Sequence, residues 1–405
     1  MKVILHDFSG HPFQAELARK LAETGNEVEH VFAGQYVSGK GHLEADEDDS
    51  DDLTFTNITL DLPFQKYTPL ARLRFEVAYA RAWIRRLKAA PADIVVACNL
   101  PLVSMYLFSR HAKRSKLPYV MWHQDIYSNG LSDELHRKFP GWIAKIGARV
   151  FERMEAYCAR NASHVVAIGE AFKDVYPRWK VPPGNVSVIP NWAPLDKVFP
   201  VGRTNASSAE LFGEDDCLRL VYAGTIGRKH NPRLLVDLLR HALDNGIDAR
   251  MAVISEGEAA DDLAQIASSE RLPIRVLGFQ PPDKLPDVLG SADVLVALLE
   301  PDATKFSIPS KVLSYMAAGR PILGLMPADN PAAIDIKDAG GFVADPSDLG
   351  AKSACAWLIE LSSNPELVAE IGQQTRSIAE LKFDVNSVAR EFEAIFSAAV
   401  GTQRT

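Results

Sequence analysis

Ser310 and Lys311 are the residues of this sequence best suited to bind an anion. They follow Pro309 and begin a predicted helix, within the stretch DVLVALLEPDATKFSIPSKVLSYMAAGRPILGL at 293–325. Proline disfavours an earlier helical start, and Ser310 is a good capping residue for a helix that starts at Lys311. The free backbone N–H groups and positive dipole end of such a helix attract anions, and Lys311 adds a full charge. An ordinary βαβ unit with a capping serine explains the same residues. The choice between an anion-binding site and a plain helix start therefore depends on the other loops of the chain.

A second candidate anion-binding loop is GTIGRK at 224–229. Gly224 and Thr225 follow a predicted strand, and Arg228 and Lys229 come shortly before a predicted helix. Arginine binds a phosphate through two parallel hydrogen bonds and lysine acts as a point charge, so this loop can neutralise a diphosphate. The alternative is a pair of exposed basic residues at a helix start.

Two further turns have the composition of ligand-binding loops. Ser255 and Glu256 precede Gly257 at the end of a predicted strand, where they can line a pocket for a base or a ribose. Gly10 lies in the first strand-to-helix turn, where the missing side chain allows close approach to the backbone. Ordinary turn geometry explains Gly10 equally well. No GxGxxG follows the first strand, so the sequence lacks a dinucleotide-binding fingerprint.

His123 and Asp125 form a polar cluster at the carboxyl end of a predicted strand, Tyr119–His123. Ligands of open α/β sheets bind at this end of the strands. A histidine here can take a proton from a hydroxyl acceptor or bond to a transferring sugar. A histidine that ends a buried strand also commonly serves as a structural hydrogen-bonding group, and this alternative stays open.

Predicted strands and helices alternate along the chain, which favours an α/β fold with parallel sheets. At 405 residues the chain is long for one core, so two domains are expected. The polar stretch 191–217 is the best linker candidate. We therefore predict domains at 1–200 and 201–384, and a final helix at 385–405 that packs back on the N-terminal domain.

Bulk composition excludes several classes of protein. Hydrophobic residues make up 47% and charged residues 24%, as in globular proteins. No apolar run reaches the ~20 residues that a membrane-spanning helix requires, and the N-terminus begins a strand without the apolar region of a signal peptide. Cys98, Cys158, Cys217 and Cys355 have neither zinc-site spacing nor the density of a disulfide framework. These features indicate a cytoplasmic protein.

The charge of the chain is unevenly distributed. The net charge is −8, yet the segment 66–160 contains 17 basic and 7 acidic residues, a net charge of +10. This segment also contains predicted amphipathic helices and Trp142, a composition that suits a peripheral contact with an anionic membrane surface. A solvated basic surface is the alternative.

Four motifs taken in order resemble the glycosyltransferases of family 4, and the resemblance covers nearly the whole chain. They are Ser9-Gly10-His11, LVYAGTIGRK at 220–229, Ser255-Glu256-Gly257, and P-S-K-x-L-x-x-x-A-x-G-R-P at Pro309–Pro321. The last motif is similar to a branch that builds bacterial exopolysaccharide and O-antigen repeat units on lipid carriers, which includes colanic acid and fucosamine transferases. The resemblance implies a GT-B fold, in which two Rossmann-like domains face each other across a cleft.

The resemblance also implies the chemistry. A nucleoside-diphosphate sugar is the expected donor, held mainly by the second domain, and transfer retains the anomeric configuration without a required metal or other cofactor. Lys311 and a basic residue of the 224–229 loop, either Arg228 or Lys229, are expected to bind the diphosphate. His123 is expected to contact the sugar near the reacting carbon.

Two positions depart from the family pattern. The family places two glutamates eight residues apart around the helix start, where this sequence has Phe306 and Ser314. Ser314 can bind a ribose only weakly, so Glu300 or Asp302, in the preceding loop, is a candidate replacement.

The sequence thus predicts an enzyme that moves a sugar to the hydroxyl group of a lipid-linked or other glycan, at the inner face of a membrane. No nucleic-acid partner is expected. The missing glutamates leave open a non-catalytic nucleotide-sugar-binding subunit, and the fold leaves open a UDP-sugar epimerase.

Overall fold

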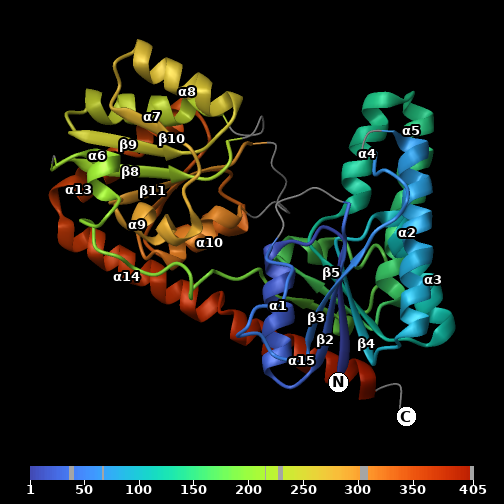
Figure 1. Cartoon of the computed structure of the whole chain (residues 1–405). Helices are drawn as coiled ribbons and strands as arrows, with labels where there is room; N and C mark the ends of the chain where they lie inside the picture. Colours follow the sequence, from blue (N-terminus) through green and yellow to red (C-terminus); the bar gives the residue numbers. More distant parts are fainter. Residues whose placement is uncertain (36–40, 66–67, 215, 227–230, 302–308, 402–405) are drawn as a thin grey trace. The chain divides into compact units, whose positions relative to one another are not determined.

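The computed structural model describes residues 1–35, 41–65, 68–214, 216–226, 231–301 and 309–401. The chain forms two compact units, one of Met1–Asn191 with Val385–Thr405 and the other of Trp192–Asp384. The polypeptide therefore leaves the first unit at Asn191, earlier than the predicted boundary at residue 200. Each unit is a parallel sheet with helices on both faces (Figure 1), which confirms the predicted α/β class with two Rossmann-like sheets.

The first unit is built on a seven-stranded sheet with the order β3-β2-β1-β4-β5-β6-β7. All neighbouring strands are parallel. The central strands β4 and β5 are buried along their whole length, as expected for short apolar runs covered by helices on both sides. The strands are β1 (Lys2–Asp7), β2 (Glu27–Ala33), β3 (Leu53–Ile58), β4 (Ile94–Cys98), β5 (Tyr119–His123), β6 (His164–Ala167) and β7 (Val186–Val188).

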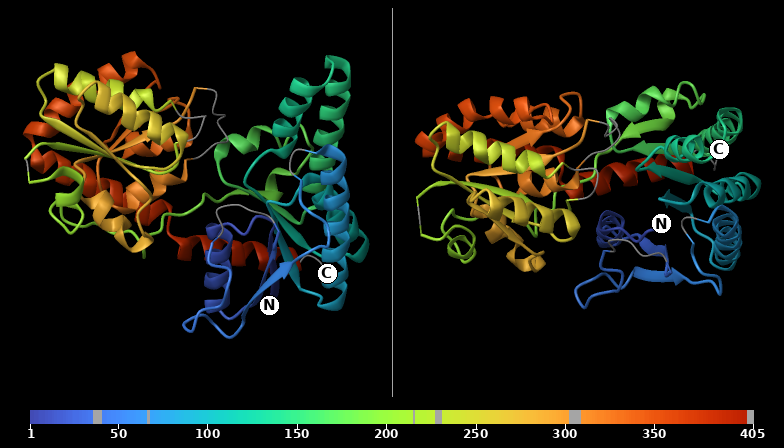
Figure 2. Two further views of the ribbon diagram at one scale, coloured as in Figure 1. Left: turned by 45° about the horizontal axis from the view of Figure 1, so that its top comes forward. Right: turned by 90° about the horizontal axis from the view of Figure 1, so that it is seen from above.

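The helices of the first unit form two groups on opposite faces of its sheet (Figures 1 and 2). Helices α1 and α15 pack together on one face, and α2, α3, α4 and α5 form a contiguous group on the other. The α-helices are α1 (Pro12–Glu23), α2 (Pro69–Ala89), α3 (Leu102–Ser115), α4 (Tyr127–Lys138), α5 (Gly141–Asn161) and α15 (Val385–Gly401), with short 3-10 helices η1 (Glu170–Asp174) and η2 (Pro183–Asn185).

Helix α15 belongs to the first unit although it ends the chain. The Glu393 carboxylate accepts hydrogen bonds from the Thr24 hydroxyl at 2.5 Å and the Asn26 amide at 2.8 Å. The Phe392 ring lies 5.1 Å, centre to centre, from the ring of Trp122 on β5. The C-terminal helix therefore completes the core of a unit whose other residues end at Asn191.

The second unit has a six-stranded parallel sheet with the order β10-β9-β8-β11-β12-β13. Its apolar strands β8 and β11 are buried throughout. The strands are β8 (Leu218–Ala223), β9 (Ala249–Ile254), β10 (Ile274–Leu277), β11 (Val294–Leu298), β12 (Ile322–Leu325) and β13 (Phe342–Ala344).

Helix α7 of the second unit is strongly amphipathic, with six leucine, valine and alanine side chains buried on one side. The helices are α6 (Ser208–Phe212), α7 (Arg233–Asp244), α8 (Glu258–Ser269), η3 (Pro282–Lys284), α9 (Leu285–Gly290), α10 (Ser310–Ala317), α11 (Pro331–Asp338), α12 (Asp348–Ser353), α13 (Cys355–Ser363) and α14 (Pro365–Lys382). In the described part of the chain, no helix combines the length and apolar content that crossing a bilayer requires.

The sequence analysis missed strand β3 and helix α4. The sequence of α4, YSNGLSDELHRK, contains a glycine and few apolar residues, so its helical preference is weak. The structure supplies the missing stability through packing against α5 and through a buried carboxylate at the helix start, described below.

Candidate functional site

In each sheet there is one pair of adjacent strands whose connecting segments leave in opposite directions. Ligands of α/β proteins bind at the carboxyl ends of such a pair. In the second unit this pair is β8 and β11, and in the first unit it is β1 and β4. The predicted site residues of the second unit gather at the first of these pairs. Gly224 and Thr225 follow β8, Glu300 follows β11, and Lys311 lies at the start of α10.

Gly224 and Lys311 come together directly. Gly224 has a φ of +136°, which favours glycine, and a side chain at this position would place its Cβ 3.3 Å from Cε and 3.5 Å from Nζ of Lys311. The absent side chain therefore leaves room for the lysine to cross the end of β8.

The Lys311 ammonium group lies against an aromatic residue. Its Nζ is 4.0 Å from the ring centre of Tyr222 and donates a hydrogen bond to the Tyr222 hydroxyl. That hydroxyl in turn donates to the Thr225 carbonyl oxygen at 3.0 Å. Burial lowers the pKa of Lys311 to about 8. Because no described carboxylate lies within ion-pairing distance of Lys311, a bound anion would supply the missing counter-charge.

Tyr315 attaches helix α10 to strand β8. Its hydroxyl accepts a hydrogen bond from the Ala223 backbone N–H at 2.8 Å and donates one to the Ala223 carbonyl at 3.0 Å. Tyr315 is buried, and burial raises its pKa well above the ordinary value. This pair of bonds fixes the first turn of α10, and with it Lys311, beside Gly224. The sequence analysis named neither Tyr222 nor Tyr315 as a site residue.

The prediction that Ser310 caps this helix is wrong. Pro309 occupies the capping position with an extended backbone, and Ser310 is the first residue of α10. No side-chain capping hydrogen bond forms, because the capping position is held by a proline, which has no hydrogen-bonding side chain. The exposed Ser310 hydroxyl therefore remains at the helix start, where it can bond to a ligand.

Ser255 and Glu256 connect neighbouring loops at the end of β9. The buried Ser255 hydroxyl accepts a hydrogen bond from the Ile226 backbone N–H at 3.1 Å, which orders the loop after Gly224. The Glu256 carboxylate accepts a bond from the Phe279 N–H at 2.9 Å. In the described chain both groups therefore act on the backbone of adjacent loops.

The remaining predicted residues of the second unit are only partly described. Glu300 is half-buried just after β11, and Ser314 is half-buried within α10. Arg228, Lys229, Asp302 and Phe306 lie outside the described residues. In the described part of the chain, no group of His, Cys, Asp and Glu side chains is arranged to hold a metal ion.

In the first unit, His123 is 1% exposed and both of its ring nitrogens have partners. Nε2 lies 3.0 Å from Oε1 of Glu155, and Nδ1 lies 3.1 Å from the Tyr176 hydroxyl. A neutral ring that donates from Nε2 and accepts at Nδ1 satisfies both contacts. The expected direct contact between His123 and a sugar is therefore not supported by this arrangement, and the structural alternative fits it.

Glu155 holds the start of helix α4. Its carboxylate is fully buried and accepts hydrogen bonds from the backbone N–H groups of Tyr127 at 2.9 Å and Ser128 at 2.8 Å. A carboxylate at this position satisfies two otherwise unpaired N–H groups and interacts favourably with the helix dipole. Asp125 lies just before this helix and is exposed, so it is the more accessible member of the predicted His123–Asp125 pair.

Gly10 and an unpredicted carboxylate lie where the connections from β1 and β4 diverge. Gly10 has a φ of +71°, and its N–H donates to the Asp7 carbonyl at 3.2 Å. The buried Asp7 side chain accepts bonds from the Asn99 amide at 2.8 Å and the Ser9 N–H at 3.2 Å. Burial raises the pKa of Asp7. The sequence signal for this pair is a polar residue at the end of each of two adjacent strands, Asp7 at the end of β1 and Asn99 directly after β4.

Comparisons with known proteins agree with this geometry. A family model described as a glycosyl transferase 4-like domain matches residues 11–192, and one for glycosyl transferases of group 1 matches residues 217–361. The chain is a GT-B glycosyltransferase of family 4. It is 23% identical over 312 residues to the probable glycosyltransferase WbjE of Pseudomonas aeruginosa, a match that covers 76% of this chain and 75% of WbjE.

Solved structures of other glycosyltransferases have the same fold as this chain. Anabaena HepE, crystallised with UDP and glucose, superposes with a TM-score of 0.69 at 16% identity, covering 98% of this chain and 100% of HepE. WaaG, a glycosyltransferase involved in lipopolysaccharide biosynthesis, superposes with a TM-score of 0.65 at 17% identity, covering 98% and 99% of the two chains. As a glycosyltransferase of this family, the enzyme transfers a sugar from a nucleotide sugar.

Proposed function

We propose that this glycosyltransferase moves a hexose from a UDP-sugar, with retention, to a hydroxyl group of a lipid-linked glycan used in cell-surface polysaccharide. The observation that carries the donor half is the half-buried Lys311 ammonium group, which lies beside Gly224 at the start of α10 without a described carboxylate partner. HepE was crystallised with UDP and with UDP-glucose, which supports UDP as the nucleotide.

The diphosphate leaving group gains negative charge as the glycosidic bond breaks. Lys311 and the N–H groups at the start of α10 would stabilise that charge more strongly in the transition state than in the ground state. Arg228 or Lys229 would add a second cation. In the retaining mechanism implied by the family resemblance, the leaving phosphate can accept the proton of the acceptor hydroxyl, so a side-chain nucleophile is unnecessary.

The first unit is proposed to bind the acceptor. Asp125 is exposed at the carboxyl end of β5, where it can accept a hydrogen bond from an acceptor hydroxyl. His123 and Glu155 would not contact the acceptor themselves. They would act as positioning residues that fix the backbone around Asp125. We therefore expect changes to His123 or Glu155 to reduce stability, and changes to Asp125 to reduce acceptor binding.

Two observations support a lipid-linked acceptor at a membrane surface. Trp142, Ile146 and Val150 are exposed on α5 at four-residue spacing, which places them on one face of the helix. Lys145 and Arg149 flank this apolar face and are also exposed. Such a face suits contact with an anionic lipid surface, and WaaG acts in lipopolysaccharide biosynthesis.

A thermal-shift screen of nucleotides and nucleotide sugars tests the donor assignment. A ligand that binds only the native state raises the melting temperature, so UDP and the correct UDP-sugar are expected to stabilise the enzyme more than GDP or ADP compounds do. A uniform response to all nucleotides would contradict the proposed preference for UDP.

Ser314 in place of a glutamate favours one competing function, a non-catalytic nucleotide-sugar-binding subunit. Incubation of the purified protein with the best-stabilising nucleotide sugar separates the two, because slow release of free UDP or transfer to an added glycan requires a competent catalytic site. Interconversion of free UDP-sugars without an acceptor would instead identify an epimerase.

A further inference from the structure

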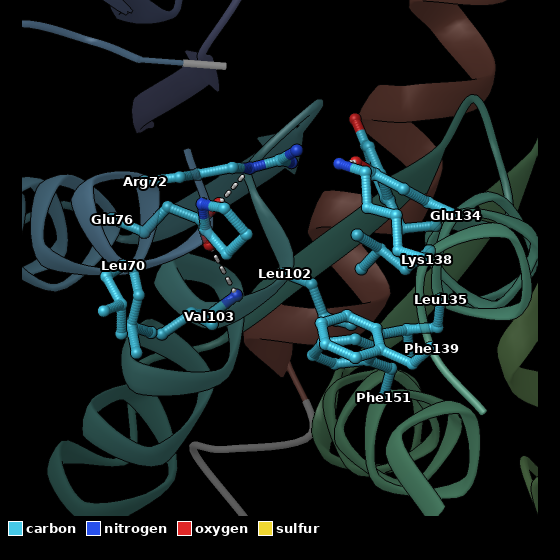
Figure 3. Close-up of a pocket in the computed structure, with 14 residues that line it drawn as sticks. Leu70, Arg72, Glu76, Leu102, Val103, Glu134, Leu135, Lys138, Phe139 and Phe151 are labelled. Carbon is cyan, nitrogen blue, oxygen red and sulfur yellow. Dashed lines mark hydrogen bonds and ion pairs between the residues drawn. The ribbon is translucent and has the colours of Figure 1, made fainter. Parts of the chain in front are cut away.

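An apolar pocket of about 330 Å³ opens among helices α2, α3, α4 and α5 of the first unit (Figure 3). Apolar side chains from all four helices line it, including Leu73, Leu102, Leu135 and Phe151. The volume falls in the range of roughly 300–1,000 Å³ that is typical of small-molecule sites.

Charged groups lie along one side of this pocket only. Arg72 donates to Glu76 at 2.8 Å, and Lys138 donates to Glu134 at 2.6 Å. The hydrogen bond from Lys138 and the nearby charge of Arg72 both lower the pKa of Glu134, so these side chains of α2 and α4 interact across the pocket. Figure 3 shows their charged ends together on one side and the leucine and phenylalanine side chains on the other. The pocket therefore suits an apolar chain that ends in a polar group.

The pocket connects an exposed apolar rim to the proposed acceptor site. Leu70 and Phe139 line it and are themselves exposed. Tyr127 also lines it and is the first residue of α4, two positions after Asp125. A ligand in the pocket thus contacts both the exposed rim and the start of α4.

The helices around the pocket carry a positive charge that differs from the rest of the chain. Helix α2 contains six basic residues and one acidic residue, and the segment 127–161 contains six basic and four acidic residues. The whole chain has a net charge of −8. An anionic end group would therefore be attracted to these helices specifically, and a neutral apolar molecule would not be.

We propose that this pocket binds the apolar chain of the lipid-linked acceptor, an isoprenoid chain that ends in a phosphate. The assignment rests on the proposed function, since it takes the lipid acceptor as given and identifies where its chain is held. The chain lies among α2, α3, α4 and α5. Its charged end group lies at the polar side of the pocket, near the ion pairs of Arg72 and Lys138, where the net positive charge of the surrounding helices attracts it, and the sugar it carries is directed toward Asp125.

Binding of farnesyl phosphate, measured by calorimetry, tests this proposal on the full-length protein. Leu73→Trp fills the pocket with a larger side chain and is expected to weaken binding at least tenfold. Ile359→Trp is the matched control: Ile359 is 44% exposed and Leu73 45%, but Ile359 lies on α13 of the second unit and does not line the pocket. The control should bind farnesyl phosphate within twofold of wild type. A second filling variant, Leu135→Trp, is expected to behave as Leu73→Trp does.

Two further measurements separate the possible outcomes. Leu73→Trp should bind phosphatidylglycerol vesicles as wild type does; a matching loss of vesicle and farnesyl phosphate binding would assign these residues to a membrane contact and overturn the proposal. Absence of farnesyl phosphate binding to wild type would also overturn it. UDP binding measured on the same samples reports on the donor site independently, so failure of UDP to bind would contradict the proposed function and leave the pocket result unaffected.

Discussion

Two polar sites at the ends of parallel strands contain a lysine or histidine side chain, yet they differ in whether that side chain is fully partnered within the protein. At the end of β8, Lys311 contacts the ring and hydroxyl of Tyr222, with no described carboxylate in ion-pairing range. At the end of β5, the ring of His123 lies 3.0 Å from the buried carboxylate of Glu155. The Lys311 ammonium group has no counter-charge until an anion binds, whereas both ring nitrogens of His123 already have partners within the protein.

This difference separates a binding site from a structural support. Burying an ammonium group without a counter-charge costs free energy, and an incoming diphosphate offsets that cost. A buried pair whose hydrogen bonds are already made within the protein gains nothing from a ligand. Removing such a pair should therefore lower the stability of the fold more than the affinity for a ligand. The four predictions below test this distinction, from the largest effect to the smallest.

The largest effect is expected on stability, from Glu155→Gln. The amide cannot accept hydrogen bonds from His123, Tyr127 and Ser128 together, so at least one buried donor loses its partner and we expect the free energy of unfolding to fall by about 3 kcal/mol. Urea denaturation measures the change. Glu170→Gln removes an exposed carboxylate paired with Lys173 and should cost under about 0.5 kcal/mol. Equal stability of the two variants would show that the buried pair contributes little.

Lys311→Ala should weaken UDP binding by at least about tenfold, the value of one charge-assisted hydrogen bond. Isothermal titration calorimetry measures the affinity directly. Lys382→Ala is the matched control, because Lys382 lies in the same unit but pairs with Asp335 and Asp338. Wild-type affinity in Lys311→Ala would remove this lysine from the donor site.

A smaller loss of UDP affinity, about threefold to tenfold, is expected for Gly224→Ala. The new Cβ would lie 3.3 Å from Cε of Lys311 and would displace the side chain, and the positive φ would strain the loop. Gly246→Ala separates these effects: Gly246 also has a positive φ, of +81°, but a Cβ there meets nothing within 4 Å. If both variants lose affinity equally, steric contact with Lys311 is not the cause.

The smallest effect is a pH dependence. The pKa of Lys311 is lowered from 10.5 to about 8, so above pH 8 the free enzyme loses the charge that attracts a diphosphate. UDP affinity is therefore expected to fall, by severalfold, as the pH rises from 7 to 9.5, and this slope should be reduced in Lys311→Ala. For folding the sign is opposite: a lysine with a lowered pKa destabilises the native state below pH 8, and the penalty decreases between pH 8 and 10.5. A slope that is unchanged in Lys311→Ala would assign the titration to another group.

The sequence predicted the strands and their ends well, because buried parallel strands are short apolar runs with polar residues directly after them. Gly224, Lys311 and Asp125 were found in this way, since each follows such a strand or begins the next helix. These predictions depend on local patterns only, and local patterns are what a single sequence displays.

The partners of these residues could not be predicted in the same way. Glu155 lies 32 residues from His123, and Tyr222 lies 89 residues from Lys311. Such pairs are brought together by the order of strands and the packing of helices, which residue spacing does not specify. The capping role assigned to Ser310 failed for a finer reason: the helix begins one residue earlier than its proline suggested, which changes the direction of the hydroxyl.

The place of helix α15 has a consequence for how the chain is made. The first unit needs Val385–Gly401 to cover Trp122 and to supply Glu393 to Thr24 and Asn26, yet these residues are synthesised only after the whole of the second unit. The second unit, Trp192–Asp384, is contiguous and can fold as soon as it has been synthesised. The first unit therefore completes its core only after the second unit has been synthesised. A chain interrupted before Val385 yields a second unit with its own complete core and a first unit that lacks part of its core.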